Sequence, residues 1–244
     1  MFAQSATSEC LPTVVRTSRI VDLVAQGLGA DPDTPLLIRG ERSVGKDSLA
    51  RLIHAESPRR NHIFVKVNCR VEPADHHEAD LFGHEKGASP QAARRRLGSL
   101  ELAHEGTLYM DEIGAMPCGL VPKLLQALRS REVSRCGGAE RIPVDARVIA
   151  STSQTTGAGD GVWQGLRDLS AVEICVPPLR QRADEIPVFA SFFLERLNRR
   201  YRRNVCLSPD VLADFQGRPW PGNLDELEEE VYRLVTGGVR ALVH

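Results

Sequence analysis

The chain has 244 residues, of which 42% are hydrophobic and 26% charged, and its formal net charge is −1. This length suits one large domain or a domain with a small appendage, and the balanced charge gives no overall attraction to nucleic acid or to an anionic membrane. The six cysteines are widely separated, which indicates reduced thiols rather than a disulfide scaffold. The sequence has neither a signal-peptide pattern nor an apolar run of the ~20 residues that span a membrane. We therefore expect a cytoplasmic protein with no membrane contact.

The first part of the chain alternates between helical and strand patterns. Apolar residues at helical spacing over residues 16–28 precede a break at Asp31-Pro32-Asp33, and an apolar strand follows at 36–39. Further segments follow in the order helix 48–55, strand 63–67, strand 107–110, helix 121–128 and strand 146–150. Such alternation is typical of a parallel sheet with crossover helices. We expect an α/β fold with three αβα layers.

The last part of the chain is helical. After the prolines at 177, 178 and 187, helical patterns occupy residues 188–201, 209–215 and 224–235. We therefore predict an N-terminal tail at 1–15, an α/β subdomain at 16–180 and a small all-helical lid subdomain at 181–244.

The strand at 36–39 leads into a glycine-bounded loop with a lysine at the spacing of a phosphate-binding loop, or P-loop. Backbone N–H groups of such a loop, together with the dipole of the following helix, surround a polyphosphate, and the lysine adds a mobile positive charge. A P-loop usually has Ser or Thr directly after the lysine, whereas this chain has an aspartate there. The predicted nucleotide-binding residues are Gly40, Glu41, Arg42, Ser43, Val44, Gly45, Lys46, Asp47 and Ser48.

A second signal for nucleoside triphosphate chemistry follows in the expected order. The apolar strand at 107–110 ends in Asp111 and Glu112. An aspartate at such a strand end can hold Mg²⁺, and a neighbouring glutamate can orient a water for attack on a phosphate. Each signal alone occurs by chance, but the ordered pair predicts ATP and Mg²⁺ as cofactors, with Asp111 as the metal ligand and Glu112 as a catalytic residue.

Read outward from these motifs, the chain resembles the central AAA+ domain of the bacterial enhancer-binding proteins, which are ATPases that remodel sigma-54 RNA polymerase. The matching stretches lie in family order along nearly the whole chain: Gly45-Lys46-Asp47, Phe64-Val65-Lys66-Val67-Asn68-Cys69, Leu81-Phe82-Gly83-His84-Glu85-Lys86-Gly87-Ala88, 106–114, Pro177-Pro178-Leu179-Arg180-Gln181-Arg182 and Trp220-Pro221-Gly222-Asn223. The resemblance implies a P-loop AAA+ fold with a helical lid. It makes an acidic Asp47 normal, and it implies that Asn68 restrains the catalytic Glu112 until the nucleotide state changes.

The chain departs from that family at its polymerase-contacting loop. The family sequence there is Gly-Ala-Phe-Thr-Gly-Ala, and this chain has Gly87-Ala88-Ser89-Pro90-Gln91-Ala92. A small hydroxyl and a proline, which fixes the backbone and removes a donor, replace the two contact residues. The usual contact with sigma-54 is therefore in doubt.

Further departures fall on positions that assist hydrolysis in the family. Ser153 stands at the nucleotide-sensing asparagine, and Asp225 stands at the lid arginine that faces the phosphates. A carboxylate there would repel the nucleotide, unless the lid stands open or Arg233 compensates. The arginine-finger positions fall on Val162 and Asp168, or on Gln164 in place of the first, which leaves Arg167 as the remaining candidate. Loss of such a finger typically removes ~10³ to 10⁵ of the rate.

We therefore expect a degenerate member of the family, namely an ATP-binding AAA+ module of a transcription regulator in which hydrolysis is impaired or absent. Two alternatives stay open: an active ATPase that remodels sigma-54 RNA polymerase, and an interaction scaffold that works without nucleotide. The resemblance implies an RNA polymerase sigma factor or another transcription regulator as partner, with assembly of a homo-oligomeric ring. We expect no DNA-binding domain in this chain.

Two weaker patterns are better explained as solvated surface. Arginine runs at 94–96 and at 199–203 could contact nucleic acid phosphates, although ends and faces of helices commonly carry such runs. The histidines at 76, 77 and 84 lie among acidic residues, but the resemblance assigns that stretch to the base of the polymerase-contacting loop rather than to a metal site.

Overall fold

The computed structural model describes residues 16–32, 34–70, 74–90, 92–153, 161–169 and 171–237, without the side chains of 74–76, 161–163 and 167. The predicted tail at 1–15 lies outside this part, as does Gln91 of the predicted loop. Within the described residues, no helix is long and apolar enough to cross a membrane.

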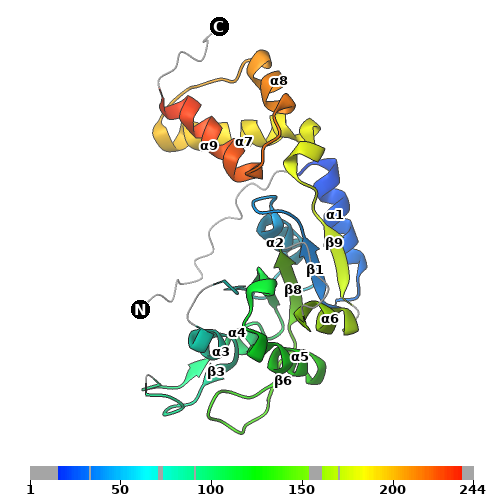
Figure 1. Ribbon diagram of the computed structural model, residues 1–244, viewed down its shortest axis with the longest axis vertical. Coiled ribbons are helices and arrows are strands. Elements are labelled where there is room, and N and C mark those ends of the chain that lie inside the picture. Colours follow the sequence, from blue (N-terminus) through cyan, green and yellow to red (C-terminus); the bar gives the residue numbers. More distant parts are fainter. Residues whose placement is uncertain are drawn as a thin grey trace.

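A five-stranded parallel sheet forms the centre of the first subdomain (Figure 1). The strands are β1 (Leu36–Arg39), β2 (Phe64–Asn68), β5 (Thr107–Asp111), β8 (Arg147–Thr152) and β9 (Val172–Cys175). They lie in the order β2-β5-β8-β1-β9. Strand β1 is an interior strand between β8 and β9, so the loop that follows it emerges between its two neighbours at the carboxyl end of the sheet. The predicted α/β class and parallel sheet are confirmed.

Helices cover both faces of this sheet and give the three predicted layers. Helices α1 (Ser18–Gly29) and α2 (Lys46–Glu56) pack on one face. The other face carries α3 (Ala74–Phe82), α4 (Ser99–Leu102), α5 (Val121–Ser130) and α6 (Gly161–Asp168). Alternate strand residues face opposite sides: Leu36 and Ile38 of β1 join the first core, and Leu37 joins the second.

Two small antiparallel hairpins project from the end of the molecule opposite the lid (Figure 1). One pairs β3 (Gly83–His84) with β4 (Arg96–Leu97), and the other pairs β6 (Glu132–Val133) with β7 (Ile142–Pro143). The buried guanidinium of Arg135 joins them, because it donates to Glu85 at 2.5 Å and to Glu101 at 2.6 and 2.8 Å. The first hairpin carries the predicted polymerase-contacting loop.

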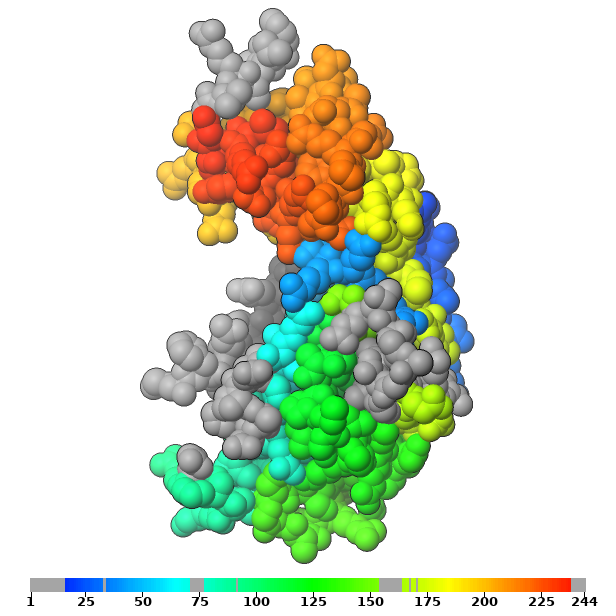
Figure 2. Space-filling view, in the orientation of Figure 1, coloured from blue at the N-terminus to red at the C-terminus, as the bar shows by residue number. Residues whose placement is uncertain are grey.

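The lid is all helical, as predicted. It consists of α7 (Ile186–Tyr201), α8 (Pro209–Gly217) and α9 (Asn223–Thr236), preceded by the short 3-10 turns η3 (Leu179–Gln181) and η4 (Ala183–Glu185). Two further 3-10 turns, η1 (Ile113–Ala115) and η2 (Cys118–Leu120), lie after β5. The lid has its own apolar core around Phe193, Trp220 and Leu227, and it lies directly above the P-loop region in Figure 2.

Candidate functional site

The predicted P-loop connects β1 to the first turn of α2. Gly45 is the N-cap of α2 with φ of 100°, a left-handed conformation that favours glycine, and no side chain caps the helix there. Gly40 lies so close to the neighbouring chain that a Cβ would stand 2.7 Å from the carbonyl oxygen of Val176. Helix α2 begins at Lys46 rather than at the predicted residue 48, because the glycine turn already ends at Gly45. The first-turn N–H groups of α2 therefore lack intrahelical partners and can bind an anion.

Lys46 is folded back over its own loop. Its Nζ donates to the carbonyl oxygens of Gly40 at 2.9 Å and Glu41 at 2.8 Å, and it lies 3.4 Å from Oε1 of Glu112. The side chain is buried, and this burial lowers the pKa of Lys46, although the charge of Glu112 opposes the shift. The lysine thus joins the P-loop to the end of strand β5.

Asp111 and Asp47 lie on either side of one lysine. Nζ of Lys66 is 3.2 Å from Oδ2 of Asp111 and 2.9 Å from Oδ1 of Asp47. Burial alone would raise the pKa of Asp111, but hydrogen bonds from Ser151 and Lys66 outweigh burial and hold the pKa below its ordinary value. Two carboxylates beside a P-loop offer the oxygen ligands that Mg²⁺ prefers, and these residues fit a metal that is completed by phosphate oxygens.

Glu112 is buried and contacts two cations. Its backbone is left-handed, with φ of 56°. Its Oε2 accepts hydrogen bonds from the backbone N–H and the hydroxyl of Ser153, both at 2.9 Å, and lies 3.2 Å from a guanidinium nitrogen of Arg70. Lys46 faces its other oxygen. The predicted water-orienting carboxylate is therefore held from both sides.

Asn68 ends strand β2, in register with Asp111 of the neighbouring strand. Its side-chain oxygen accepts a hydrogen bond from the backbone N–H of Arg70 at 3.0 Å. Among the described residues, the side chains that form a hydrogen bond or ion pair with the carboxylate of Glu112 are those of Lys46, Arg70 and Ser153. The predicted restraint of Glu112 by Asn68 stays a prediction.

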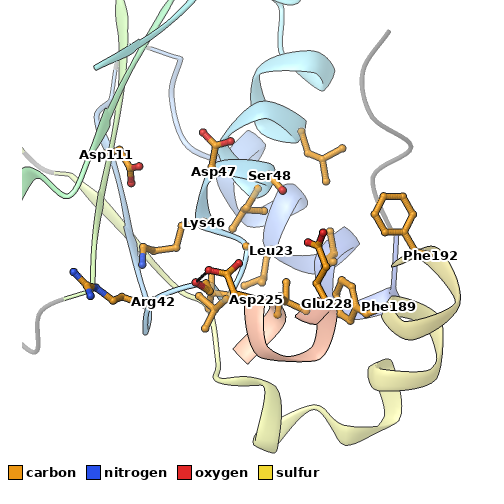
Figure 3. A pocket seen from close by; sticks show the side chains of 18 of the residues that line it. Leu23, Arg42, Lys46, Asp47, Ser48, Asp111, Phe189, Phe192, Asp225 and Glu228 are labelled. Carbon is orange, nitrogen blue, oxygen red and sulfur yellow. Dashed lines mark hydrogen bonds between the residues drawn. The ribbon is translucent and has the colours of Figure 1, made fainter. Parts of the chain in front are cut away.

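A cavity of ≈ 660 Å³ lies between the P-loop, the end of the sheet and the lid. Residues 42–48, Asn68, Asp111 and Glu112 line its polar part, whereas Gly40 and Glu41 reach the site through their carbonyl contacts with Lys46. Figure 3 shows Lys46 and Asp111 on one side, with Phe189 and Phe192 on the other. The apolar part is lined by Ile20, Leu23, Leu52, Phe189, Phe192 and Phe193. A polar end joined to an aromatic end suits a molecule with a charged part and a flat ring.

The lid is fastened to the tip of the P-loop. Arg180 binds the carboxylate of Glu41 with two hydrogen bonds, at 2.6 and 2.9 Å, and Asn223 adds a third at 3.1 Å. The Arg180 and Asn223 hydrogen bonds lower the pKa of Glu41 to about 2. Leu224 donates its backbone N–H to the carbonyl of Ser43 at 3.0 Å. The position of the lid is therefore linked to the conformation of the phosphate loop.

The residues at positions where the chain departs from the family pattern, and Arg233, which could compensate for one of them, have other contacts. Asp225 accepts a hydrogen bond from Ser43 and lines the cavity. Arg233 forms ion pairs with Glu229 at 2.5 Å and Glu230 at 3.4 Å along its own helix. Asp168 is exposed and accepts from Gln164 at 3.1 Å. The side chains of Val162 and Arg167 lie outside the described part.

Three charged or polar residues of the site were not among the predicted site residues: Lys66, Arg70 and Ser151. Ser151 of β8 donates to Asp111 at 2.9 Å and accepts from the backbone N–H of Glu112 at 3.3 Å. Lys66 lies in the middle of β2, Arg70 follows the end of β2, and Ser151 lies near the end of β8. The charged residues on either side of Asn68 were the signal in the sequence that could have identified Lys66 and Arg70. Only the pairing of β2 with β5, however, brings them to the carboxylates.

A glycine P-loop after β1, an Asp-Glu pair at the end of β5, which is separated from β1 by β8, and a helical lid define an AAA+ P-loop module. Comparison with known families agrees: residues 15–158 match the Sigma-54 interaction domain, and residues 180–241 match the AAA+ ATPase lid domain. The chain belongs to the family of sigma-54 interaction domains.

Relatives include the DNA-binding transcriptional activator HyfR of Escherichia coli K12, 40% identical over 88% of this chain and 32% of the relative. DctD, the C4-dicarboxylate transport transcriptional regulatory protein of Rhizobium meliloti, is 38% identical over 96% of this chain and 52% of its own length. The chain thus spans about a third to a half of these relatives. The structure is similar to NtrX of Brucella abortus in complex with ADP, with a TM-score of 0.79 and 33% identity over 91% of this chain and 50% of NtrX. NtrX in complex with ATP gives a TM-score of 0.76, with 32% identity over 94% of this chain and 53% of NtrX.

Proposed function

We propose that this protein is an Mg²⁺-dependent ATP-binding module of a sigma-54-type transcription regulator, in which bound nucleotide changes affinity for partners and hydrolysis is slow. The observation that carries the proposal is the cavity that joins the uncapped N-terminus of α2 and Lys46 to an aromatic end under the lid. The solved complexes of the related NtrX with ADP and ATP support it.

A bound nucleotide would occupy both the polar and the apolar part of the cavity. The first-turn N–H groups at Lys46, Asp47 and Ser48 would hold phosphates, because a helix N-terminus favours negative charge. Lys46 would turn from the carbonyls of its loop toward the β- and γ-phosphates. The apolar side chains of Leu23, Phe189 and others would enclose the base. The boundaries proposed above, 16–180 and 181–244, place this cavity between the two subdomains.

Asp47 and Asp111 would contribute to the magnesium site. Mg²⁺ usually takes one or two carboxylates together with substrate phosphates and waters, and these two carboxylates both contact the ammonium of Lys66. The metal, when bound, neutralises charge that develops on the phosphates. Lys66 would have to withdraw from one of them.

Slow hydrolysis is supported by the surroundings of Glu112. A carboxylate that accepts two hydrogen bonds from Ser153 and faces two cations is poorly placed to accept hydrogen bonds from a water. At the family's arginine-finger positions the chain has Val162 or Gln164 and Asp168, and loss of a finger costs ~10³ to 10⁵ in rate. This is the sense in which we propose a degenerate member.

The partner surface would be the hairpin loop 85–95. Gly87 donates to the carbonyl of Ala92 at 2.8 Å, and Ala92 donates to that of Ser89 at 2.9 Å, which closes a tight tip. Pro90 stands in this tip, and the buried Arg135 fixes its base. A loop without the family's Phe and Thr supports contact with a sigma factor by another mode, or with another regulator, in a ring of several copies.

The test is ATP binding and turnover on one sample of the whole chain, with Lys46→Ala, Glu112→Gln and, as a charge-matched control, Lys86→Ala on the exposed loop. We expect binding that is lost in Lys46→Ala and kept in the other two variants, with turnover no higher than in Glu112→Gln. Turnover that is clear in the wild type and lost in both Lys46→Ala and Glu112→Gln would favour the active ATPase instead. Absence of any nucleotide binding would favour the scaffold.

A further inference from the structure

Arg70 is a cation of the cavity to which the function proposed above gives no contact with the nucleotide. It follows strand β2 directly after Cys69, and its guanidinium reaches back over the end of the sheet to the cavity wall. One nitrogen lies 3.2 Å from Oε2 of Glu112 and 3.0 Å from the hydroxyl of Ser153. Its side chain keeps 33% exposure, so a ligand in the cavity can reach it.

Arg70 is not needed to hold Glu112. The same carboxylate oxygen already accepts two hydrogen bonds from Ser153, each at 2.9 Å, and these are shorter than its 3.2 Å contact with Arg70. A guanidinium has five donors in a planar fork that suits phosphate oxygens. Within the described residues, the contacts of this fork with Glu112 and Ser153 are made by one nitrogen, so the others can serve another anion.

The charges of the residues around Arg70 also favour an anion beside it. Lys46 and Arg70 contact opposite oxygens of one carboxylate, so this group of three carries a net positive charge of about one, beside a helix N-terminus that also attracts anions. The position of Lys46 indicates where the β- and γ-phosphates would lie in the cavity. The position of Glu112 indicates the side from which a water would approach the γ-phosphate. Arg70 lies beside Glu112 and therefore faces the place of a γ-phosphate.

We propose that Arg70 binds the γ-phosphate of ATP from within the same chain and lets the protein distinguish ATP from ADP. In this arrangement Arg70 turns from Glu112 to the phosphate, and it supplies in cis part of the positive charge that arginine fingers supply between subunits. The inference rests on the proposed function, because it requires that nucleotide occupies the cavity.

The test compares affinities for a non-hydrolysable ATP analogue and for ADP, both with Mg²⁺, in the wild type, Arg70→Ala and Arg70→Lys. Arg199→Ala, on the exposed face of α7, is the charge-matched control. We expect Arg70→Ala to reduce the preference for the ATP analogue over ADP by about tenfold or more, as loss of a charge-assisted contact does. Affinity for ADP should change little, Arg70→Lys should be intermediate, and Arg199→Ala should match the wild type.

The outcomes separate this inference from the proposed function. If wild type and Lys46→Ala both fail to bind nucleotide, the proposed function is wrong and the role of Arg70 falls with it. If the wild type binds and Arg70→Ala keeps the same preference for the ATP analogue, only the role of Arg70 is overturned. The same holds if Arg70→Ala weakens both ligands equally. Thermal unfolding of each variant checks that the fold is intact. If Arg70→Ala proves unstable, the comparison of Arg70→Lys with the wild type decides the test.

Discussion

The hydroxyl of Ser43 at the tip of the P-loop donates a hydrogen bond to the carboxylate of Asp225 in the lid. This contact gives Asp225 a partner at a position where the related family has an arginine toward the phosphates. The carboxylate lines the cavity and would oppose the charge of a bound polyphosphate. Asp225 therefore has two effects that substitutions can separate: its hydrogen bond with Ser43 helps to dock the lid, and its negative charge lowers the affinity for nucleotide.

Asp225→Arg is predicted to raise affinity for ATP by about tenfold, because it replaces a repelled carboxylate by a charge-assisted donor. Asp225→Ala removes both the contact with Ser43 and the negative charge, and it should give a smaller rise. Titration calorimetry on the three proteins measures the order. Weaker binding by Asp225→Arg than by Asp225→Ala would contradict the assignment of this position to the phosphate side.

The pairing of Glu41 with Arg180 and Asn223 predicts a pH dependence of lid docking. Because these hydrogen bonds lower the pKa of Glu41 from 4.5 to about 2, the stabilisation is fully present above about pH 4.5 and is lost as the pH falls toward 2. Glu41→Gln should therefore lower the thermal midpoint slightly at pH 7, and the difference from wild type should shrink on acidification. The effect is small because the pair is partly exposed.

Glu195→Gln provides the control for Glu41→Gln. Glu195 also pairs with an arginine, Arg199, but within one exposed helix turn. It should change the midpoint less at pH 7. A difference between wild type and Glu41→Gln that grows on acidification would have the wrong sign for this mechanism.

Trp220 is predicted to be the main support of the lid core. It is 2% exposed, donates its indole N–H to the carbonyl of Phe215 at 2.7 Å and meets the Phe215 ring edge to face. Trp220→Ala should cost about 3–5 kcal/mol of unfolding free energy, measured by urea unfolding with circular dichroism. Tyr232→Ala, on an exposed position of α9, should cost about 1 kcal/mol or less. Equal losses would contradict the assignment.

The sequence was sufficient for the elements whose signals are local. The spacing of Gly40, Gly45 and Lys46 gives the P-loop, and the apolar run before Asp111 gives a strand, which the structure has at Thr107–Asp111. Strand β9 was not predicted, because it is a four-residue edge strand with only two apolar residues directed at the core side. The two-residue strands of the hairpins are too short to give any periodic pattern.

The contacts within the site could not be predicted, since they depend on strand register. Pairing of Asn68 with Asp111 brings the residues on either side of Asn68 to the neighbouring carboxylates. Lys66 thereby reaches Asp111, and Arg70 reaches Glu112. A sequence motif fixes the identity of Asp111 and Glu112 but not the cations that approach them from the next strand.

Lys66 is predicted to compete with Mg²⁺. Its ammonium lies 2.9 Å from Asp47 and 3.2 Å from Asp111, so the metal must displace a cation that the protein itself supplies. Lys66→Gln removes the positive charge at similar length and leaves both carboxylates for the metal. The Mg²⁺ concentration that half-saturates ATP binding should therefore fall by about threefold to tenfold, measured by titrating Mg²⁺ at fixed ATP. Lys86→Gln, on the exposed loop, should leave it unchanged. A rise in Lys66→Gln would mean that Lys66 holds phosphate rather than opposing the metal.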